Sequence, residues 1–473
     1  MCSAGRWYNG AMQEFESITG LWSWSELCSA LGVPSTDGPD VSRVVVDSRQ
    51  VRPGDLFLAL PGDPGPRFNP SHRTNNDGHD YMDDALQKGA VGVLGVRPPT
   101  ATGAPFLKVE DTYDALWTLG SAARARLSGP VIAVTGSSGK TTAKAFLTHA
   151  LQAYSPPGSF NNHIGVPLAL INAPHQANAY VFEIGTSHPG EILPLAEMAK
   201  PDFAMVLNVH TAHVGNFPSW EDLKLEKLSI FKALSDSSKA VSEVSLGVSH
   251  GWTFGQAEHA DGYLQEISGN RAMMQLRDES VTFSVPAGGT HRALTACATV
   301  LMTKLVTGSV KGAIAMPDTL VPAGRGSENW LRGGSLVVLD DSYNANPQSM
   351  KAALTAFGER TDVNRRMALI GEMLELGDEA QSAHLELAPV LRHFDHVICV
   401  GEGTRLLATE LGASWYQEAT DEVLDYVCQH VDGWLGEQTG SAETKQAEGV
   451  VVKGSNRVFW SKQFVQKLLK RLG

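Results

Sequence analysis

The sequence predicts an α/β protein with about three domains, and three observations support this prediction. The chain has 473 residues, about three times the length of a common domain. Unbroken apolar runs with polar tips recur along it and alternate with longer helical segments, as in parallel strands buried on both faces. One run, Val131–Thr142 (VIAVTGSSGKTT), turns into a glycine-bounded loop that ends in Lys-Thr-Thr.

The loop within that run has the composition of a phosphate-binding site. Gly136 and Gly139 let backbone N–H groups face anionic oxygens. Lys140 supplies a cation, and Thr141 supplies a hydroxyl for a bound magnesium ion. The stretch Ala143–Tyr154 reads as a helix whose N-terminal dipole points at the same phosphate. The strict P-loop pattern has one more glycine, so the match is to a variant. An ordinary turn also favours Gly and Ser, but Lys-Thr-Thr directly after the second glycine favours a nucleotide site.

The pattern of apolar and polar segments divides the chain into three expected domains. Residues 1–128 read as a small mixed α/β domain, 129–326 as a central P-loop NTPase-like domain with a parallel sheet, and 327–473 as a Rossmann-like domain. Residues 252–285 alternate in a β pattern and are expected to form an added small sheet, whereas the polar segment 437–448 is expected to be a surface loop. The candidate strands are Val41–Arg49, Asp55–Gly62, Val91–Val96, Val131–Gly136, Ala179–Gly185, Phe203–Val209, Ser335–Ser342, Met367–Met373, His396–Gly403 and Gly449–Ser455.

Composition narrows the class of protein. A formal net charge of −13 argues against a nucleic-acid partner, because a basic face could not easily dominate the field. The sequence contains no apolar stretch long enough to span a bilayer, and its first residues do not resemble a secretory signal. The five cysteines are scattered and form no C-x-x-C pair, which indicates free thiols in a reducing cytoplasm.

Reactive residues lie at or beyond the C-terminal ends of several candidate strands. They are Lys140, Glu183, His213, Asp341 and Lys453. In open parallel sheets the ligand crevice lies beyond those ends, so two facing α/β domains would bring these residues together. Charges can also simply mark where strands leave the core, which is an even chance for any one of them but a weaker explanation for all. Glu183 in an apolar strand is costly unless a cation compensates it, and magnesium beside a nucleotide is the natural partner.

Two residues are less transparent from the sequence alone. A lone histidine such as His213 is more often structural than functional, and Lys227 reads as a solvated helix charge.

Several runs nevertheless resemble the Mur ligases, ATP-dependent amide-forming enzymes of bacterial cell-wall synthesis. They are the phosphate loop, Asn161–Pro167 (NNHIGVP), Asn208–His213 (NVHTAH) and the lysine before an Ile-Phe pair.

The resemblance covers nearly the whole chain and points to one reaction within the family. The run Asp340–Leu354 (DDSYNANPQSMKAAL) is similar to the members that add D-alanyl-D-alanine to UDP-N-acetylmuramoyl-tripeptide through an acyl phosphate. What the resemblance implies is an N-terminal domain for the UDP-linked substrate, a central domain for ATP, a C-terminal ligase domain, and a monomer in the cytoplasm.

The family's roles map onto residues of this sequence. The ATP-binding residues implied are Thr135, Gly136, Ser137, Ser138, Gly139, Lys140, Thr141, Thr142, Arg325 and Asp341. The ligands implied for two Mg²⁺ ions are Thr141, Glu183, His213 and Lys227, the last as a carbamate, which turns a cation into a carboxylate. The catalytic residues implied are Lys140, His213 and Lys227. The substrate contacts implied are Ser48 for the uridine diphosphate, Asn161 and Asn162 for the acyl substrate, and Asn344 and Asn346 for the dipeptide.

The chain also departs from the family, which keeps other interpretations open. The family commonly has His-Asn-x-x-Asn where adenine is held, and this chain has Arg292 and Thr295 at the amide positions. Arg292 could stack on adenine and Thr295 could keep one hydrogen bond. The 63–76 loop looks longer than usual. The alternatives are a folylpolyglutamate-type or cyanophycin-type ligase, or a nucleotide-dependent regulatory protein. The third residue of the tripeptide, diaminopimelate or lysine, stays open.

Overall fold

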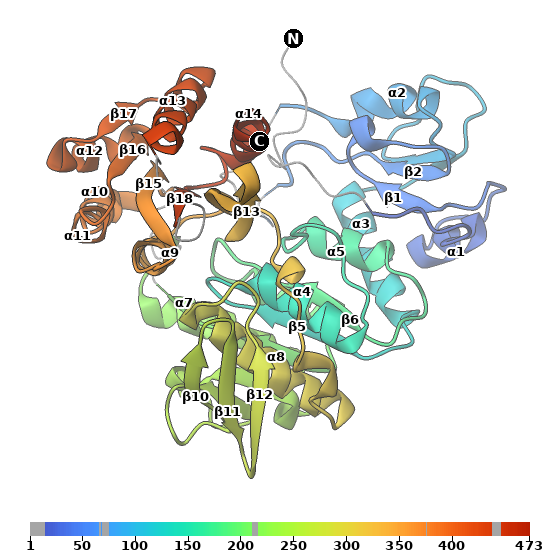
Figure 1. Cartoon of the computed structure of the whole chain (residues 1–473). Helices are drawn as coiled ribbons and strands as arrows, with labels where there is room; N and C mark the ends of the chain where they lie inside the picture. Colours follow the sequence, from blue (N-terminus) through green and yellow to red (C-terminus); the bar gives the residue numbers. More distant parts are fainter. Residues whose placement is uncertain (1–14, 66–67, 69–74, 211–215, 375, 438–445) are drawn as a thin grey trace.

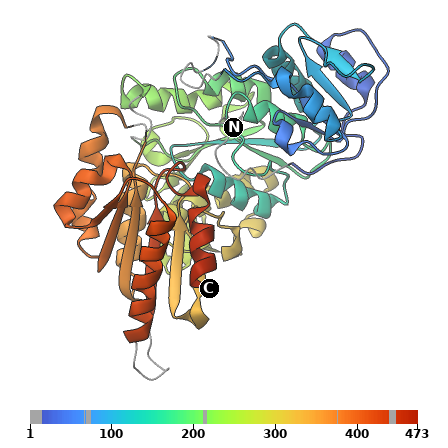
Figure 2. The same cartoon turned by 90° about the horizontal axis from the view of Figure 1, so that it is seen from above.

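Three β-sheets organise the computed structural model of the chain (Figure 1), which describes residues 15–65, 68, 75–210, 216–374, 376–437 and 446–473. The sheets have four, eight and six strands, and each is built from consecutive parts of the chain. Both views place the N-terminal and C-terminal parts on different sides of the central one (Figure 1, Figure 2). The predicted α/β class is confirmed. Within the described residues, no helix is long and apolar enough to cross a membrane.

The N-terminal sheet is wholly parallel, with strand order β1-β2-β3-β4. All its strands are short, and the residues of β1, β2 and β3 are buried, as the apolar runs predicted. Strand β1 lies at an edge of this sheet. The elements are α1 (Trp24–Leu31), β1 (Arg43–Val45), β2 (Asp55–Leu58), α2 (Met82–Gln87), β3 (Gly92–Gly95), β4 (Phe106–Lys108) and α3 (Thr112–Ala125).

Buried hydrogen bonds join this domain to the central one. The side-chain amide of Asn172 accepts from the backbone N–H of Val44 at 2.8 Å and donates to its carbonyl at 3.0 Å. The indole N–H of Trp22 donates to the carbonyl of Ile171 at 3.0 Å. Helix α3 also packs against two helices of the central domain, so one apolar cluster continues across both.

The central sheet has the order β12-β11-β10-β9-β8-β7-β5-β6 and is parallel from β6 to β10. Strand β5 is buried on both faces, because Val131 and Ala133 belong to one apolar cluster and Ile132 and Val134 to another. The elements are β5 (Val131–Thr135), α4 (Lys140–Leu151), α5 (Gly165–Ile171), β6 (Tyr180–Glu183), α6 (Ile192–Ala199), β7 (Phe203–Val206), α7 (Trp220–Leu228), β8 (Ala240–Glu243), β9 (Trp252–Gly255), β10 (Gly262–Ser268), β11 (Arg271–Leu276), β12 (Glu279–Ser284) and α8 (Thr290–Thr307).

The expectation of a separate small sheet over residues 252–285 is wrong. Strand β9 pairs with β8 in parallel, and β10 pairs with β9, so these strands extend the central sheet. The β pattern itself was read correctly, since β10, β11 and β12 are antiparallel neighbours. Alternation shows that a strand is half-buried, but it does not show which strand it joins.

The C-terminal sheet has the order β13-β14-β18-β15-β16-β17 and is parallel except for β13. Of the expected surface loop at 437–448, residues 438–445 lie outside the described residues, while Glu437 ends a helix and Ala447 begins a strand. The elements are β13 (Ser327–Leu331), β14 (Leu336–Asp341), α9 (Pro347–Gly358), β15 (Val363–Gly371), α10 (Ala380–Leu385), α11 (Ala388–Leu391), β16 (His396–Val400), α12 (Arg405–Leu411), β17 (Ser414–Tyr416), α13 (Asp421–Glu437), β18 (Ala447–Lys453) and α14 (Phe464–Leu472).

A buried ion pair between Arg43 and Asp55 fastens the first two strands, with N–O distances of 3.0 and 2.6 Å. Replacing Asp55 with alanine leaves a buried guanidinium without its carboxylate, so we expect a loss of about 3–5 kcal/mol in the free energy of unfolding. Urea denaturation followed by tryptophan fluorescence measures it. The control is Asp80→Ala, which breaks an exposed pair with Arg97 and should cost less than about 1 kcal/mol. Equal losses in the two variants would contradict the prediction.

Candidate active site

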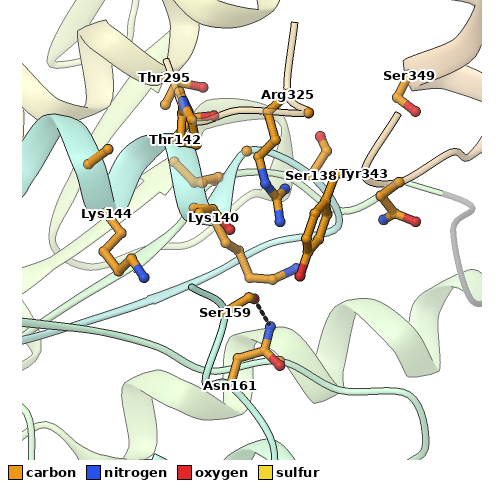
Figure 3. Close-up of a pocket in the computed structure, with 18 of the residues that line it drawn as sticks. Ser138, Lys140, Thr142, Lys144, Ser159, Asn161, Thr295, Arg325, Tyr343 and Ser349 are labelled. Carbon is orange, nitrogen blue, oxygen red and sulfur yellow. Dashed lines mark hydrogen bonds between the residues drawn. The ribbon is translucent and has the colours of Figure 1, made fainter. Parts of the chain in front are cut away.

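One cavity of about 2240 Å³ gathers most of the predicted site residues. It lies where the carboxyl ends of central and C-terminal strands meet, as the strand-end pattern predicted. Figure 3 shows Arg325 and Tyr343, from the C-terminal side, pointing toward Ser138 and Lys140 of the phosphate loop. The predicted residues that line the cavity are Ser137, Ser138, Gly139, Lys140, Thr141, Thr142, Asn161, Asn162, Arg325, Asp341, Asn344 and Asn346.

Five predicted residues that the structure describes do not line this cavity. They are Ser48, Thr135, Gly136, Glu183 and Lys227. Ser48 belongs to the N-terminal domain, where its carbonyl accepts from Lys88 at 3.1 Å, so its predicted contact with the uridine diphosphate stays a prediction. His213 lies outside the described residues, and so do most residues of the 63–76 loop.

The phosphate loop connects β5 to α4 with the geometry that its glycines allow. Gly139 caps α4 with a φ of +79°, in the left-handed region that favours glycine. Lys140 is the first residue of the helix, and its Nζ donates to the carbonyl of Gly136 at 2.6 Å. Burial and the nearby Arg325 lower the pKa of Lys140 to about 8, against the opposing effect of Glu183. Its hydrogen bond to Gly136 places the Lys140 side chain over the loop that would hold the phosphates.

A segment after β7 holds the loop in shape. The Ser138 N–H donates to Asn208 Oδ1 at 2.9 Å, and the Ser137 N–H donates to the Asn208 carbonyl at 3.0 Å. The His210 N–H donates in turn to Ser137 Oγ at 2.9 Å. The sequence interpretation used Asn208 only as part of a motif and missed this role. The Asn208 side-chain amide forms hydrogen bonds with the loop backbone, as the backbone of a neighbouring strand would.

Glu183 is a buried charge that contacts the first turn of α4, next to the cavity. Its Oε2 accepts from Thr141 Oγ1 and from Ser159 Oγ, both at 3.1 Å. Lys144 Nζ forms an ion pair with its Oε1 at 3.1 Å. The same ammonium donates to the carbonyls of Pro156 and Gly158. Burial raises the pKa of Glu183, but Lys144, Arg325 and Lys140 outweigh it and lower the pKa below its ordinary value.

The donor set fits magnesium beside a nucleotide. Thr141 and Glu183 offer hard oxygen atoms, and Thr141 Oγ1 lies 3.1 Å from Oε2 of Glu183. Among the described residues no cluster of three or more His, Cys, Asp or Glu side chains could hold a metal alone. Mg²⁺ is commonly held by one or two protein oxygens together with phosphate and water, so a sparse protein set suits it.

Lys227 is not the solvated helix charge that its sequence context suggests. It lies in α7 and is 1% exposed. Burial and the positive charge of Lys140 hold its pKa well below the usual value, against the opposing effect of Glu226. The uncharged amine is the form that reacts with carbon dioxide, so the environment suits the predicted carbamate.

The C-terminal residues are organised around the end of β14. Asp341 pairs with Lys453 at 2.6 Å, and the same ammonium donates to the Asn344 carbonyl at 3.3 Å. The Arg325 guanidinium lies 4.1 Å from the centroid of the Tyr343 ring. Asn346 caps α9 by accepting from the Ser349 N–H at 2.9 Å, so part of its side chain is already engaged.

The residues near the expected adenine position are also engaged. The Arg292 guanidinium donates to the carbonyls of Ala287, Gly288, Arg325 and Gly326 at 3.0–3.3 Å. Thr295 Oγ1 donates to the His291 carbonyl at 3.0 Å. Arg292 thus ties α8 to the connection into the C-terminal domain, and its stacking on adenine stays a prediction.

Comparison with known proteins places the chain in a family. The profile described as the Mur ligase middle domain matches residues 134–303, and that described as the Mur ligase, glutamate ligase domain, matches residues 329–455. The UDP-N-acetylmuramoyl-tripeptide–D-alanyl-D-alanine ligase of Mycobacterium tuberculosis is 31% identical over 470 residues, covering 87% of this chain and 89% of that protein.

Solved structures agree with the sequence relatives. The crystal structure of MurF from Acinetobacter baumannii has a TM-score of 0.76 at 26% identity, over 96% of this chain and 99% of that one. MurF from Thermotoga maritima in complex with ADP has a TM-score of 0.70 at 25% identity, with coverage of 91% and 97%. The chain therefore belongs to the Mur ligase family, among the UDP-N-acetylmuramoyl-tripeptide–D-alanyl-D-alanine ligases.

Proposed function

We propose that this chain uses ATP to join D-alanyl-D-alanine to the terminal carboxylate of UDP-N-acetylmuramoyl-tripeptide, giving the pentapeptide precursor of peptidoglycan. One observation carries the proposal. The phosphate loop and the Asn161–Asn162 segment line a single cavity together with Arg325, just before the C-terminal sheet, and Asp341 within it. A ligase of this kind needs a triphosphate, a carboxylate and an amine at one place, and the family relatives carry that name.

The chemistry proceeds in two steps. A carboxylate is a poor electrophile, so the γ-phosphoryl group of ATP first passes to it, giving an acyl phosphate and ADP. The dipeptide amine then attacks the acyl carbon and loses a proton, and inorganic phosphate leaves through a tetrahedral intermediate. Closure of the cavity around the reactants excludes water, which would otherwise hydrolyse the acyl phosphate.

The chain's own residues supply charge and orientation for these steps. Lys140 is the cation nearest the loop, and Arg325 approaches from the C-terminal side, so together they neutralise charge on the transferring phosphoryl group. Asn208 keeps the loop N–H groups in place for the phosphate oxygens. Asn161 and Asn162 stand where the acyl substrate would approach, and Asn344 and Asn346 stand near the dipeptide.

Two magnesium ions complete the proposed site. When bound, they neutralise phosphate charge and orient the in-line transfer. Thr141 and Glu183 would hold the first ion, and carbamylated Lys227 with His213 the second. The burial of Lys227 and the contact between Thr141 and Glu183 support these assignments.

The proposed division into domains 1–128, 129–326 and 327–473 assigns the UDP part to the first, ATP to the second and the dipeptide to the third. Each sheet lies within one of these ranges. We also propose a monomer in the cytoplasm. The described cysteines, which have free thiols, support a reducing compartment.

A regulatory nucleotide-binding protein is the competing proposal from another class. Only Arg292 and Thr295, which differ from the residues common in the family, favour it. Arg292 also forms hydrogen bonds with the connection between domains. A binding protein would not need Lys227, an amine kept buried beside the phosphate loop.

Phosphate release tests the function directly. We expect release only when ATP, the UDP-tripeptide and D-alanyl-D-alanine are all present, because the acyl phosphate is broken down by the dipeptide amine. A coupled phosphate assay with each substrate omitted in turn measures this, and tripeptides ending in diaminopimelate or lysine can be compared in the same assay. Rapid phosphate release from ATP alone would identify a nucleotide switch instead.

We expect Lys140→Ala to abolish ligation while the fold persists. Loss of one group that stabilises developing charge already costs about a hundred- to a thousandfold in kcat. Steady-state ligation and circular dichroism measure the two effects. Lys304→Ala is the control, since this lysine forms a half-exposed ion pair with Glu279 in the same domain. Normal turnover by Lys140→Ala would remove the phosphate-loop assignment.

We expect Lys227→Ala to be severely impaired and to recover in part when formate or acetate is added. A small carboxylate can enter the space of the lost side chain and replace the carbamate. Activity is measured over a concentration series of the acid. Lys140→Ala in the same series should not recover, because it lacks a cation and not a carboxylate. Wild-type turnover by Lys227→Ala would refute the second metal site.

A further inference from the structure

Lys144 is a buried cation that the proposed reaction has not yet used. It lies one helical turn after Lys140 in α4, and its side chain is 6% exposed. Its ammonium donates to the carbonyl of Pro156 at 2.8 Å and to the carbonyl of Gly158, and it pairs with Glu183 at 3.1 Å. Lysine is almost never buried to this extent unless it is paired, so the three partners account for its position.

Two of those partners begin the segment that leads to the acyl-substrate residues. Immediately after Gly158, Ser159 Oγ donates to Glu183 Oε2 at 3.1 Å. Asn161 Nδ2 donates to Ser159 Oγ at 3.0 Å, the contact drawn in Figure 3. The Asn161 carbonyl accepts from the Gly185 N–H at 2.7 Å. Lys144 and Glu183 therefore hold the segment 156–161 at Pro156, Gly158 and Ser159, and Gly185 holds it at Asn161.

We propose that Lys144 is a positioning residue for ligation, which fixes the acyl-substrate segment to the phosphate loop. This inference rests on the proposed function. Lys140 and Lys144 are four residues apart on one helix, a rise of about 6 Å along a rigid element. Lys140 binds the phosphate, and Lys144 binds the segment 156–161, which positions the carboxylate. Helix α4 thus sets the distance between the two reacting groups.

The carbonyl contacts separate this role from simple neutralisation of Glu183. A counter-ion alone would need only the ion pair, yet the ammonium directs hydrogens to Pro156 and Gly158. Loss of Lys144 should therefore displace the acyl substrate more than the nucleotide. A misplacement of about 1 Å costs on the order of a hundredfold in rate.

The test compares Lys144→Met and Lys144→Gln with wild type in the full chain, with Lys304→Met as the control lysine. We expect kcat to fall about a hundredfold and the KM for the UDP-tripeptide to rise about tenfold, while the Kd for ADP changes less than about threefold. We expect Lys144→Gln to retain more activity than Lys144→Met, because its amide can still donate to one carbonyl. Hydrogen exchange of residues 158–162 should become about tenfold faster, a readout that does not need activity.

Ser159→Ala tests the same segment from its other side. We expect a smaller loss with the same KM pattern, and an effect that does not add to that of Lys144→Gln. If Lys144→Met does not fold, Lys144→Gln and Ser159→Ala decide the outcome.

Three results would overturn the proposal. The first is unchanged kcat and tripeptide KM in the Lys144 and Ser159 variants. The second is a loss of ADP affinity as large as the rise in tripeptide KM, which would assign Lys144 to the nucleotide site. The third is unchanged hydrogen exchange in 158–162. A wild-type enzyme that ligates nothing would refute the proposed function instead, while the exchange measurement still tests Lys144.

Discussion

The carboxylate of Glu183 carries its charge at the end of a strand whose residues are all buried, and the surrounding structure compensates that charge. Thr141 and Lys144 reach it from helix α4, and Ser159 reaches it from the segment that follows this helix. A buried charge without such partners would cost several kcal/mol. Because all three must arrive together, the phosphate loop and the acyl-substrate segment are placed by the same group.

Much of this arrangement could be predicted from the sequence because it is local. The strands of the parallel sheets are continuous apolar runs. The sequence therefore shows that Lys140, Glu183 and Asp341 lie at or just after the C-terminal ends of strands. The loop glycines and Lys-Thr-Thr define a phosphate site without any knowledge of neighbours. The resemblance then supplied the C-terminal partners, and the cavity brings most of them together.

The rest depends on contacts between distant segments, which periodicity does not record. The sequence predicts a magnesium ion as the partner of Glu183 but does not indicate that Lys144, which reads as an ordinary helix charge, also pairs with it. Asn208 holds the loop from 70 residues away, and Arg292 also hydrogen-bonds to the connection between domains. The strands of 252–285 show the same limit, since half-burial does not name the sheet that a strand joins.

The amide of Asn172 has a consequence beyond joining two domains. Strand β1 is an edge strand, and edges with unpaired N–H and C=O groups recruit other chains into aggregates. The outward-facing N–H and carbonyl of Val44 both form hydrogen bonds with this one side chain. The Asn172 amide thus replaces the pair of hydrogen bonds that a neighbouring strand would make. The N-terminal sheet is thereby closed to growth on that side, so the joint between domains also works as a safeguard for solubility.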